Sequence, residues 1–86
     1  MSQFSIRFLR RARKDLEKIP TKTQDRILKA IQNLGADPYP SGSKKLEGSS
    51  DSFRIRVGDY RVIYEIADQI RVVRVNRVRH RREVYR

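Results

Sequence analysis

Strict alternation of apolar and polar residues in the second half of the chain is the feature that most limits its fold. FRIRV (53–57) and YRVIYEI (60–66) place an apolar side chain at every second position, and IRVVRVNRV (70–78) keeps much of that pattern. A period of two is typical of strands that bury one face. Short turns separate the segments, and Gly58-Asp59 is a two-residue hairpin signal. This half predicts a three-stranded antiparallel meander.

The first half of the chain changes from a strand pattern to a helical one. QFSIRFL (3–9) alternates and predicts a strand. Apolar residues then recur three and four positions apart, which indicates two helices separated by Pro20. In the second helix, Thr21 and Gln24 are expected to form a capping box and Gly35 a left-handed C-terminal cap. The apolar stripes are Leu9, Ala12, Leu16 and Ile19, then Ile27, Leu28, Ile31 and Leu34.

Together these patterns predict a single α+β domain over residues 1–86. We expect an N-terminal strand, a two-helix hairpin and the meander, with the helices packed on one face of a four-stranded antiparallel sheet. ADPYPSGSKKLEGSSDS (36–52) is rich in Pro, Gly, Ser and Asp and is predicted to be a long loop. The chain shows neither a signal peptide nor an apolar run of membrane-spanning length, which favours a cytoplasmic protein without a membrane partner.

Positive charge dominates the composition. Lys and Arg number 21 against 10 Asp and Glu, a formal net charge of +11. Such a charge repels itself in a compact fold and indicates an anionic partner, with nucleic acid ahead of an acidic protein or an anionic membrane. Simple solubility is the alternative, which the uneven placement of the cations disfavours. With no cysteine and one histidine, the chain is expected to use no metal and no cofactor.

The Gly58-Asp59 hairpin fixes which side chains share a face of the sheet. It pairs Arg56 with Arg61 and places both, with Arg54, on the face away from the helices. Like charges directly opposite each other destabilise a sheet, although splaying into water limits the cost to ~0.5 kcal/mol. Guanidinium groups match phosphate oxygens in pairs, so a phosphate between the two arginines is the functional interpretation.

The last strand is expected to follow the same division of faces. Keeping apolar pairs across the second hairpin requires Val73 and Val75 to point toward the helices. The open face of this strand then carries Arg74, Asn76 and Val78 and, two positions further, His80.

RNA is a substrate that such a face can cleave, because RNA carries its own nucleophile in the 2′-hydroxyl. Cleavage needs a base, an acid and cations around the transition state. Arginine is too basic for proton transfer, whereas His80 exchanges protons near neutrality and Tyr85 can donate a proton or stack on a base. Glu65 is expected to neutralise Arg74 instead. This set is small, so either a larger assembly presents a strained substrate or the protein only binds RNA. The alternative for His80 is a surface residue with no task.

Three segments carry a family resemblance. KKLEG (44–48), FRIRVGDYRVIYEI (53–66) and HRREVYR (80–86) follow in order and spacing the RelE branch of the RelE/ParE toxin superfamily, which the chain resembles over nearly its whole length. The resemblance implies a toxin of a toxin–antitoxin pair, a ribosome-dependent, metal-independent endoribonuclease. Such a toxin cleaves mRNA in the ribosomal A site and inhibits translation. The implied partners are a RelB-like antitoxin, the ribosome with its rRNA, and mRNA.

The resemblance also implies the site residues. The family's strand arginine, late arginine and near-terminal tyrosine correspond to Arg61, Arg81 and Tyr85, and His80 joins them as the fourth catalytic candidate. The residues expected to bind RNA phosphates are Arg54, Arg56, Arg74, Lys44 and Lys45.

The chain departs from the best-known family pattern at three positions. Arg54, Arg56 and His80 stand where that pattern has lysines. A lysine can be tuned toward a base and an arginine practically cannot, so we expect His80 to carry the proton transfer. Two alternatives stay open: a ParE-like toxin of the same fold that acts on DNA gyrase, which HRREVYR (80–86) argues against, and a non-catalytic module that binds RNA or an antitoxin.

Overall fold

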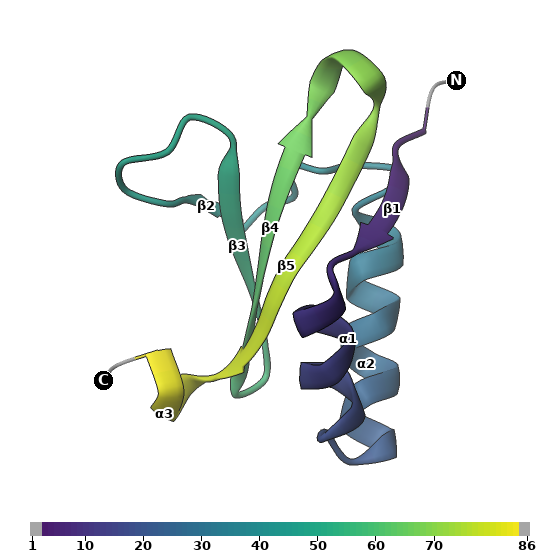
Figure 1. Cartoon of the computed structure of the whole chain (residues 1–86), viewed down its shortest axis with the longest axis vertical. Helices are drawn as coiled ribbons and strands as arrows, with labels where there is room; N and C mark the ends of the chain where they lie inside the picture. Colours follow the sequence, from purple (N-terminus) through teal and green to yellow (C-terminus); the bar gives the residue numbers. More distant parts are fainter. Residues whose placement is uncertain (1–2, 85–86) are drawn as a thin grey trace.

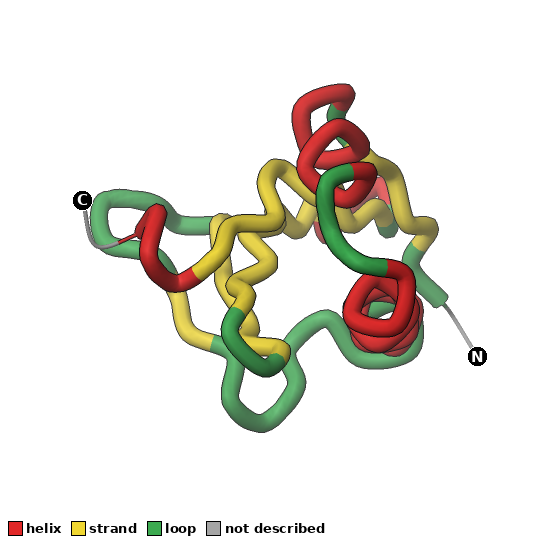
Figure 2. The backbone as a smooth tube through the Cα atoms, turned by 90° about the horizontal axis from the view of Figure 1, so that it is seen from below, coloured by secondary structure: helices red, strands yellow, loops and turns green. Residues whose placement is uncertain are grey.

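The computed structural model describes residues 3–84, which form two layers (Figure 1). The elements are β1 (Ser5–Phe8), α1 (Arg10–Glu17), α2 (Thr21–Asn33), β2 (Lys44–Lys45), β3 (Ser52–Val57), β4 (Tyr60–Ala67), the 3-10 helix η1 (Asp68–Ile70), β5 (Val72–His80) and α3 (Arg81–Val84). The sheet has the order β1-β5-β4-β3-β2. Figure 2 shows α1 and α2 together on one side of it, with α3 on the other. The predicted α+β class and order of elements are confirmed.

The sheet differs from the expected four antiparallel strands at both edges. β1 pairs in parallel with β5, with Ile6 beside Val73. The path of the chain explains this direction (Figure 1). α1 continues in the direction of β1, and α2 brings the chain back to the level where β1 began. β3 therefore runs in the same direction as β1, β4 runs in the opposite direction, and β5 again runs in the direction of β1. At the other edge, the predicted loop contributes a fifth strand, in which Lys44 pairs with Arg54.

The central hairpin has the predicted register. Arg56 lies opposite Arg61 and Val57 opposite Tyr60. Gly58 has a φ of 59°, a conformation that glycine adopts without steric cost and other residues rarely do. The glycine therefore fixes the tight turn, and the turn fixes which side chains face outward.

The predicted apolar stripes meet in a core between the two layers. Each fully buried Val or Ile side chain contributes roughly 1.5–3 kcal/mol relative to its exposed state. Leu9 and Leu28 are half-buried at the edges of the two helical stripes. The buried apolar residues are Phe4, Ala12, Leu16, Ile19, Ile27, Ile31, Leu34, Ile55, Val62, Tyr64, Ile66, Val73, Val75 and Val78.

Both predictions about the ends of α2 are wrong. Pro20 is the N-cap residue, no side chain caps the helix, and Gln24 Nε2 instead donates to Leu16 O at 2.7 Å. Gly35 does not have a positive φ. It is needed for close approach, because Phe4 N donates to Gly35 O at 2.8 Å and a Cβ on Gly35 would lie 3.1 Å from Phe4 O. Gln24 and Gly35 therefore make contacts outside α2 instead of capping it.

Tyr64 ties the long loop to the sheet. Its buried hydroxyl donates to Pro38 O at 2.9 Å, and burial raises the pKa of Tyr64 to about 12. We expect Tyr64→Phe to lower the free energy of unfolding by about 1–2 kcal/mol, because the carbonyl of Pro38 loses its partner. Since the folded pKa is raised, this stabilisation is present below pH 10 and is lost as the pH rises through about 12.

Urea denaturation measures the effect, and Tyr39→Phe is the matched control. The Tyr39 hydroxyl donates to Asp68 Oδ2 at 2.7 Å in an exposed position, so its loss is expected to cost no more than about 0.5 kcal/mol. Equal denaturation midpoints for the two variants would contradict the role given to Tyr64.

Candidate nucleic-acid interface

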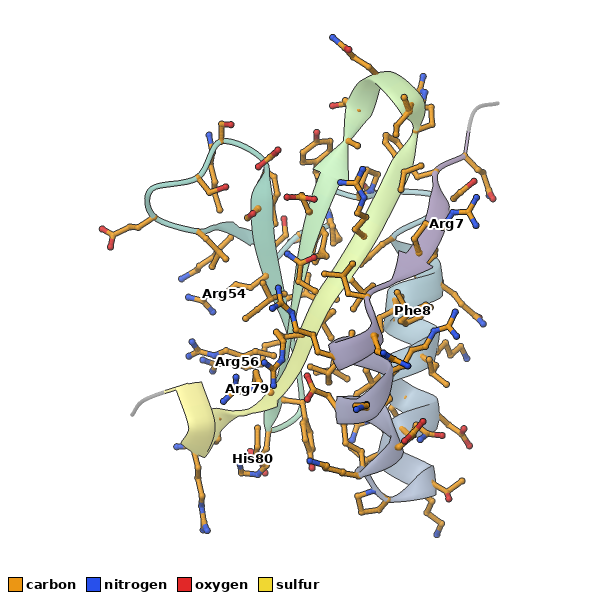
Figure 3. All side chains as sticks on the ribbon, in the orientation of Figure 1. Arg7, Phe8, Arg54, Arg56, Arg79 and His80 are labelled. Atoms are coloured by element: carbon orange, nitrogen blue, oxygen red, sulfur yellow. The ribbon has the colours of Figure 1, made fainter. Side chains whose placement is uncertain are left out.

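Arginines from three adjacent strands lie on the sheet face opposite α1 and α2. The register places Arg61 on β4 directly between Arg56 on β3 and Arg79 on β5. Arg54 precedes Arg56 by two positions and therefore shares its face. Figure 3 shows Arg54, Arg56 and Arg79 pointing away from the two helices. We call these four residues, together with Arg81, the arginine cluster.

A hollow of about 190 Å³ opens beside the β3–β4 turn and is lined by Arg56, Gly58, Asp59, Arg61 and Arg81. Arg61 is only 7% exposed, whereas Arg56 and Arg81 are exposed. Arg81 is held at the rim because its backbone N donates to Asp59 O at 2.7 Å, and its Nη1 lies 3.8 Å from Asp59 Oδ1. Three arginines thus line one space, which suits a phosphate group.

The last strand contains a β-bulge that the sequence pattern did not predict. Tyr64 pairs with Val75, but the preceding residue Ile63 pairs with Arg77, so Asn76 is the extra residue. A bulge reverses which side chains point to each face of the strand beyond it.

The bulge overturns two expectations about β5. Val78 was expected on the open face and is buried against the helices, with 3% of its surface exposed. His80 was also expected on the open face and pairs with Tyr60 on the helix-side register. Arg79, which the sequence reasoning did not single out, takes the outward position opposite Arg61.

His80 lies at the end of the sheet, beside the arginine cluster. Its ring meets the ring of Tyr60 edge-on, with centroids 5.1 Å apart. Its Nδ1 accepts a hydrogen bond from Arg82 N at 3.2 Å, which caps the short α3. A second hollow, of about 540 Å³, is lined by His80, Asp59, Arg81 and Arg82. Because Asp59 and Arg81 line both hollows, the two hollows adjoin. His80 does not line the candidate phosphate site itself, and it also lines a hollow on the helix side with Asp15 and Tyr60.

Of the remaining predicted residues, Lys44 lies beside the cluster, because it pairs directly with Arg54. Arg74 Nη1 is 2.7 Å from Glu65 Oε1, which confirms that Glu65 neutralises Arg74. Lys44 and Lys45 are exposed on the edge strand β2. Tyr85 lies outside the described residues. Within residues 3–84, no cluster of metal-ligating side chains is present and no helix is long and apolar enough to cross a membrane.

Asp15 on α1 is an important residue that the sequence reasoning missed. Its Oδ2 accepts hydrogen bonds from Arg77 Nε and Val78 N, both at 2.9 Å, and its Oδ1 accepts one from Arg77 Nη2 at 3.1 Å. Burial alone would raise the pKa of Asp15, but these bonds and the nearby positive charges outweigh it and lower the pKa. A signal existed, because spacings of three from Ala12 and four to Ile19 place Asp15 on the buried side of the helix.

Known toxins resemble this chain in sequence. A family model described as the ParE toxin of the type II toxin–antitoxin system parDE matches residues 6–85. The toxin RelG of Mycobacterium tuberculosis is 32% identical over 84 residues, which cover 96% of this chain and 97% of RelG. The putative toxin RelE1 of Methanocaldococcus jannaschii is 26% identical over 98% of this chain and 97% of its own length.

Solved structures of toxin–antitoxin complexes also match this chain. One is the toxin–antitoxin complex RelBE2 from Mycobacterium tuberculosis, with a TM-score of 0.81, 30% identity and coverage of 91% of this chain and 98% of that chain. Another is the archaeal RelE–RelB complex from Pyrococcus horikoshii, with a TM-score of 0.82, 29% identity and coverage of 94% and 97%. The resemblance seen in the sequence is confirmed: the chain belongs to the ParE toxin family and is a RelE/ParE superfamily toxin of a type II toxin–antitoxin system.

Proposed function

We propose that this toxin is a ribosome-dependent endoribonuclease that cleaves mRNA in the ribosomal A site and so stops translation. The observation that carries the proposal is the convergence of Arg56, Arg61 and Arg81 on one hollow of the uncovered sheet face. Preorganised cations of this kind stabilise the extra negative charge that develops on a phosphate in the transition state. The arginine cluster therefore offers what RNA cleavage requires beyond proton transfer.

The reaction uses the RNA as its own nucleophile. A bond forms between the 2′-oxygen and phosphorus, and the bond from phosphorus to the 5′-oxygen breaks, giving a cyclic phosphate and a 5′-hydroxyl. The 2′-hydroxyl loses a proton and the leaving oxygen gains one. His80, in the adjoining hollow, is the candidate for proton exchange because the arginines stay protonated. The ribosome supplies the aligned substrate that a site with one such side chain needs.

The positive charge of the chain also bears on which partners the toxin binds. Relatives are solved as RelE–RelB complexes, and we propose a RelB-like antitoxin for this chain as well. A net charge of +11 favours a partner with acidic segments, which would mask the arginine cluster from RNA. The ribosome, its rRNA and mRNA are the proposed targets, which places the activity in the cytoplasm.

The test compares one reporter message free in solution and programmed on ribosomes, each incubated with purified toxin. We expect primer extension to show new 5′ ends inside the ribosome-bound codons and none on free RNA. Binding to ribosomes without new ends would support the non-catalytic module instead.

A DNA gyrase supercoiling assay on the same preparation tests the second candidate, which the ParE description of the matching family favours. Inhibition of gyrase with an uncut message would replace the proposed function.

A further inference from the structure

We infer that Asp15 is a positioning residue for the candidate site: its carboxylate docks the end of β5 onto α1 in the register that turns Arg79 to the open face and holds His80 on the helix side, beside Tyr60. The contacts of Asp15 stand independently, and the consequence for cleavage rests on the proposed function. Asp15 binds Arg77 and Val78, and Arg79 and His80 directly follow these residues in the strand.

β5 loses its neighbouring strand halfway along its length. β1 pairs with it only as far as Val75, which lies beside Phe8, and Leu9 N then donates to Val75 O at 3.0 Å. Beyond this point α1 runs along the same edge of β5. A strand edge presents backbone N–H groups that need acceptors. Asp15 Oδ2 accepts the N–H of Val78 at 2.9 Å, so a helix side chain takes the place of the missing strand.

The same carboxylate binds the residue that follows the bulge. Arg77 donates from Nε and Nη2 to the two oxygens of Asp15, a two-pronged charge-assisted pair. Side-chain exposure is 14% for Asp15 and 33% for Arg77, so the pair is shielded from water more than the exposed arginines are. Asp15 thus binds two consecutive residues directly after Asn76. At Asn76 the bulge reverses which side chains point to each face of the strand.

The register of β5 beyond the bulge decides which of its side chains face the candidate site. A regular strand without the bulge would turn His80 outward and Arg79 inward, because a shift of one residue moves each side chain to the other face. Burial of Val78 and the Asp15 contacts both favour the bulged register. Burial of Val78 is enough to keep the strand in the sheet, so loss of the carboxylate charge is expected to loosen the strand end without unfolding the protein.

The kinetic test uses Asp15→Asn, which keeps the size of the side chain and removes its charge. Ribosome-dependent cleavage is measured as a function of ribosome concentration, well below the unfolding temperature of each variant. We expect kcat to fall roughly 10²-fold, as for a reacting group displaced by about 1 Å. KM is expected to stay unchanged because Arg54, Arg56 and Arg61 lie on β3 and β4, away from the loosened strand end. Glu17→Gln is the matched control: it removes the same charge from the exposed side of α1 and is expected to change neither constant.

A structural test of the same variants separates this inference from the proposed function. Asp15→Asn is expected to speed hydrogen exchange of the Val78 amide and to weaken the NOEs between the rings of Tyr60 and His80, while Glu17→Gln changes neither. A folded Asp15→Asn with protected Val78 and intact ring contacts overturns the inference, as does wild-type kcat. If the wild-type protein cuts no message, the proposed function falls, and exchange and ring contacts alone decide the role of Asp15.

Discussion

Arg61→Ala is expected to slow ribosome-dependent cleavage of mRNA by roughly 10²–10³-fold, the usual cost of removing one preorganised donor at a developing charge. Arg61 is the central member of the arginine cluster, opposite both Arg56 and Arg79. With 7% of its surface exposed, it is held by packing before any substrate arrives. The measurement is single-turnover cleavage of a message on ribosomes, with circular dichroism to show that the variant is folded.

Two further variants make the result specific. Arg7→Ala removes the same charge from an exposed position on β1, away from the cluster in Figure 3, and should leave the rate unchanged. Arg61→Lys keeps the charge but loses the planar guanidinium fork. Its cleavage rate should lie between those of the wild type and Arg61→Ala. Equal loss in Arg7→Ala would show that only total charge matters, and a folded Arg61→Ala that cuts at the wild-type rate would remove the physical basis of the proposed function.

His80→Asn is expected to lower the maximal cleavage rate by roughly 10²–10⁴-fold, the range for loss of a general acid or base. Asparagine cannot exchange protons as imidazole does. It is, however, among the best N-cap residues, so its oxygen can accept the Arg82 N–H that His80 Nδ1 accepts now. The variant therefore keeps the cap of α3 and removes the proton transfer, together with the ring contact to Tyr60. Salt-dependent binding to ribosomes should stay as in the wild type, because the arginine cluster is intact.

His80→Ala completes this comparison, because it removes both the proton exchange and the cap. If His80→Asn cuts normally and His80→Ala does not, the imidazole serves α3 and the proton-transfer role is wrong. If both lose activity equally while binding holds, the cap contributes nothing to the rate.

Features that depend on neighbours in sequence were predictable. The hairpin at Gly58, the pairing of Arg56 with Arg61 and the apolar stripes of α1 and α2 all follow from local periodicity and turn chemistry. The pairing of Glu65 with Arg74 was predictable too, since both belong to one antiparallel ladder.

Features that depend on contacts distant in sequence were not predictable. The bulge at Asn76 is favoured by burial of Val78 and by Asp15, which is more than sixty residues away. No periodicity in β5 records that contact, so the sequence pattern placed His80 on the wrong face. Gln24 shows the same limit in a helix, because the carbonyl of Leu16 competes successfully with the predicted cap.

The position of β5 in the sheet also has a consequence for how the toxin comes into being. Among the strands within residues 3–84, β5 is synthesised last, yet it lies between β1 and β4. β1 therefore has no neighbouring strand until β5 has been synthesised. Bringing Ile6 beside Val73 closes a long loop, and this closure slows folding. Arg79 and His80 belong to this late strand. A nascent chain that has not reached them holds neither the complete sheet nor the assembled cations, and harm to the cell begins only with the finished fold.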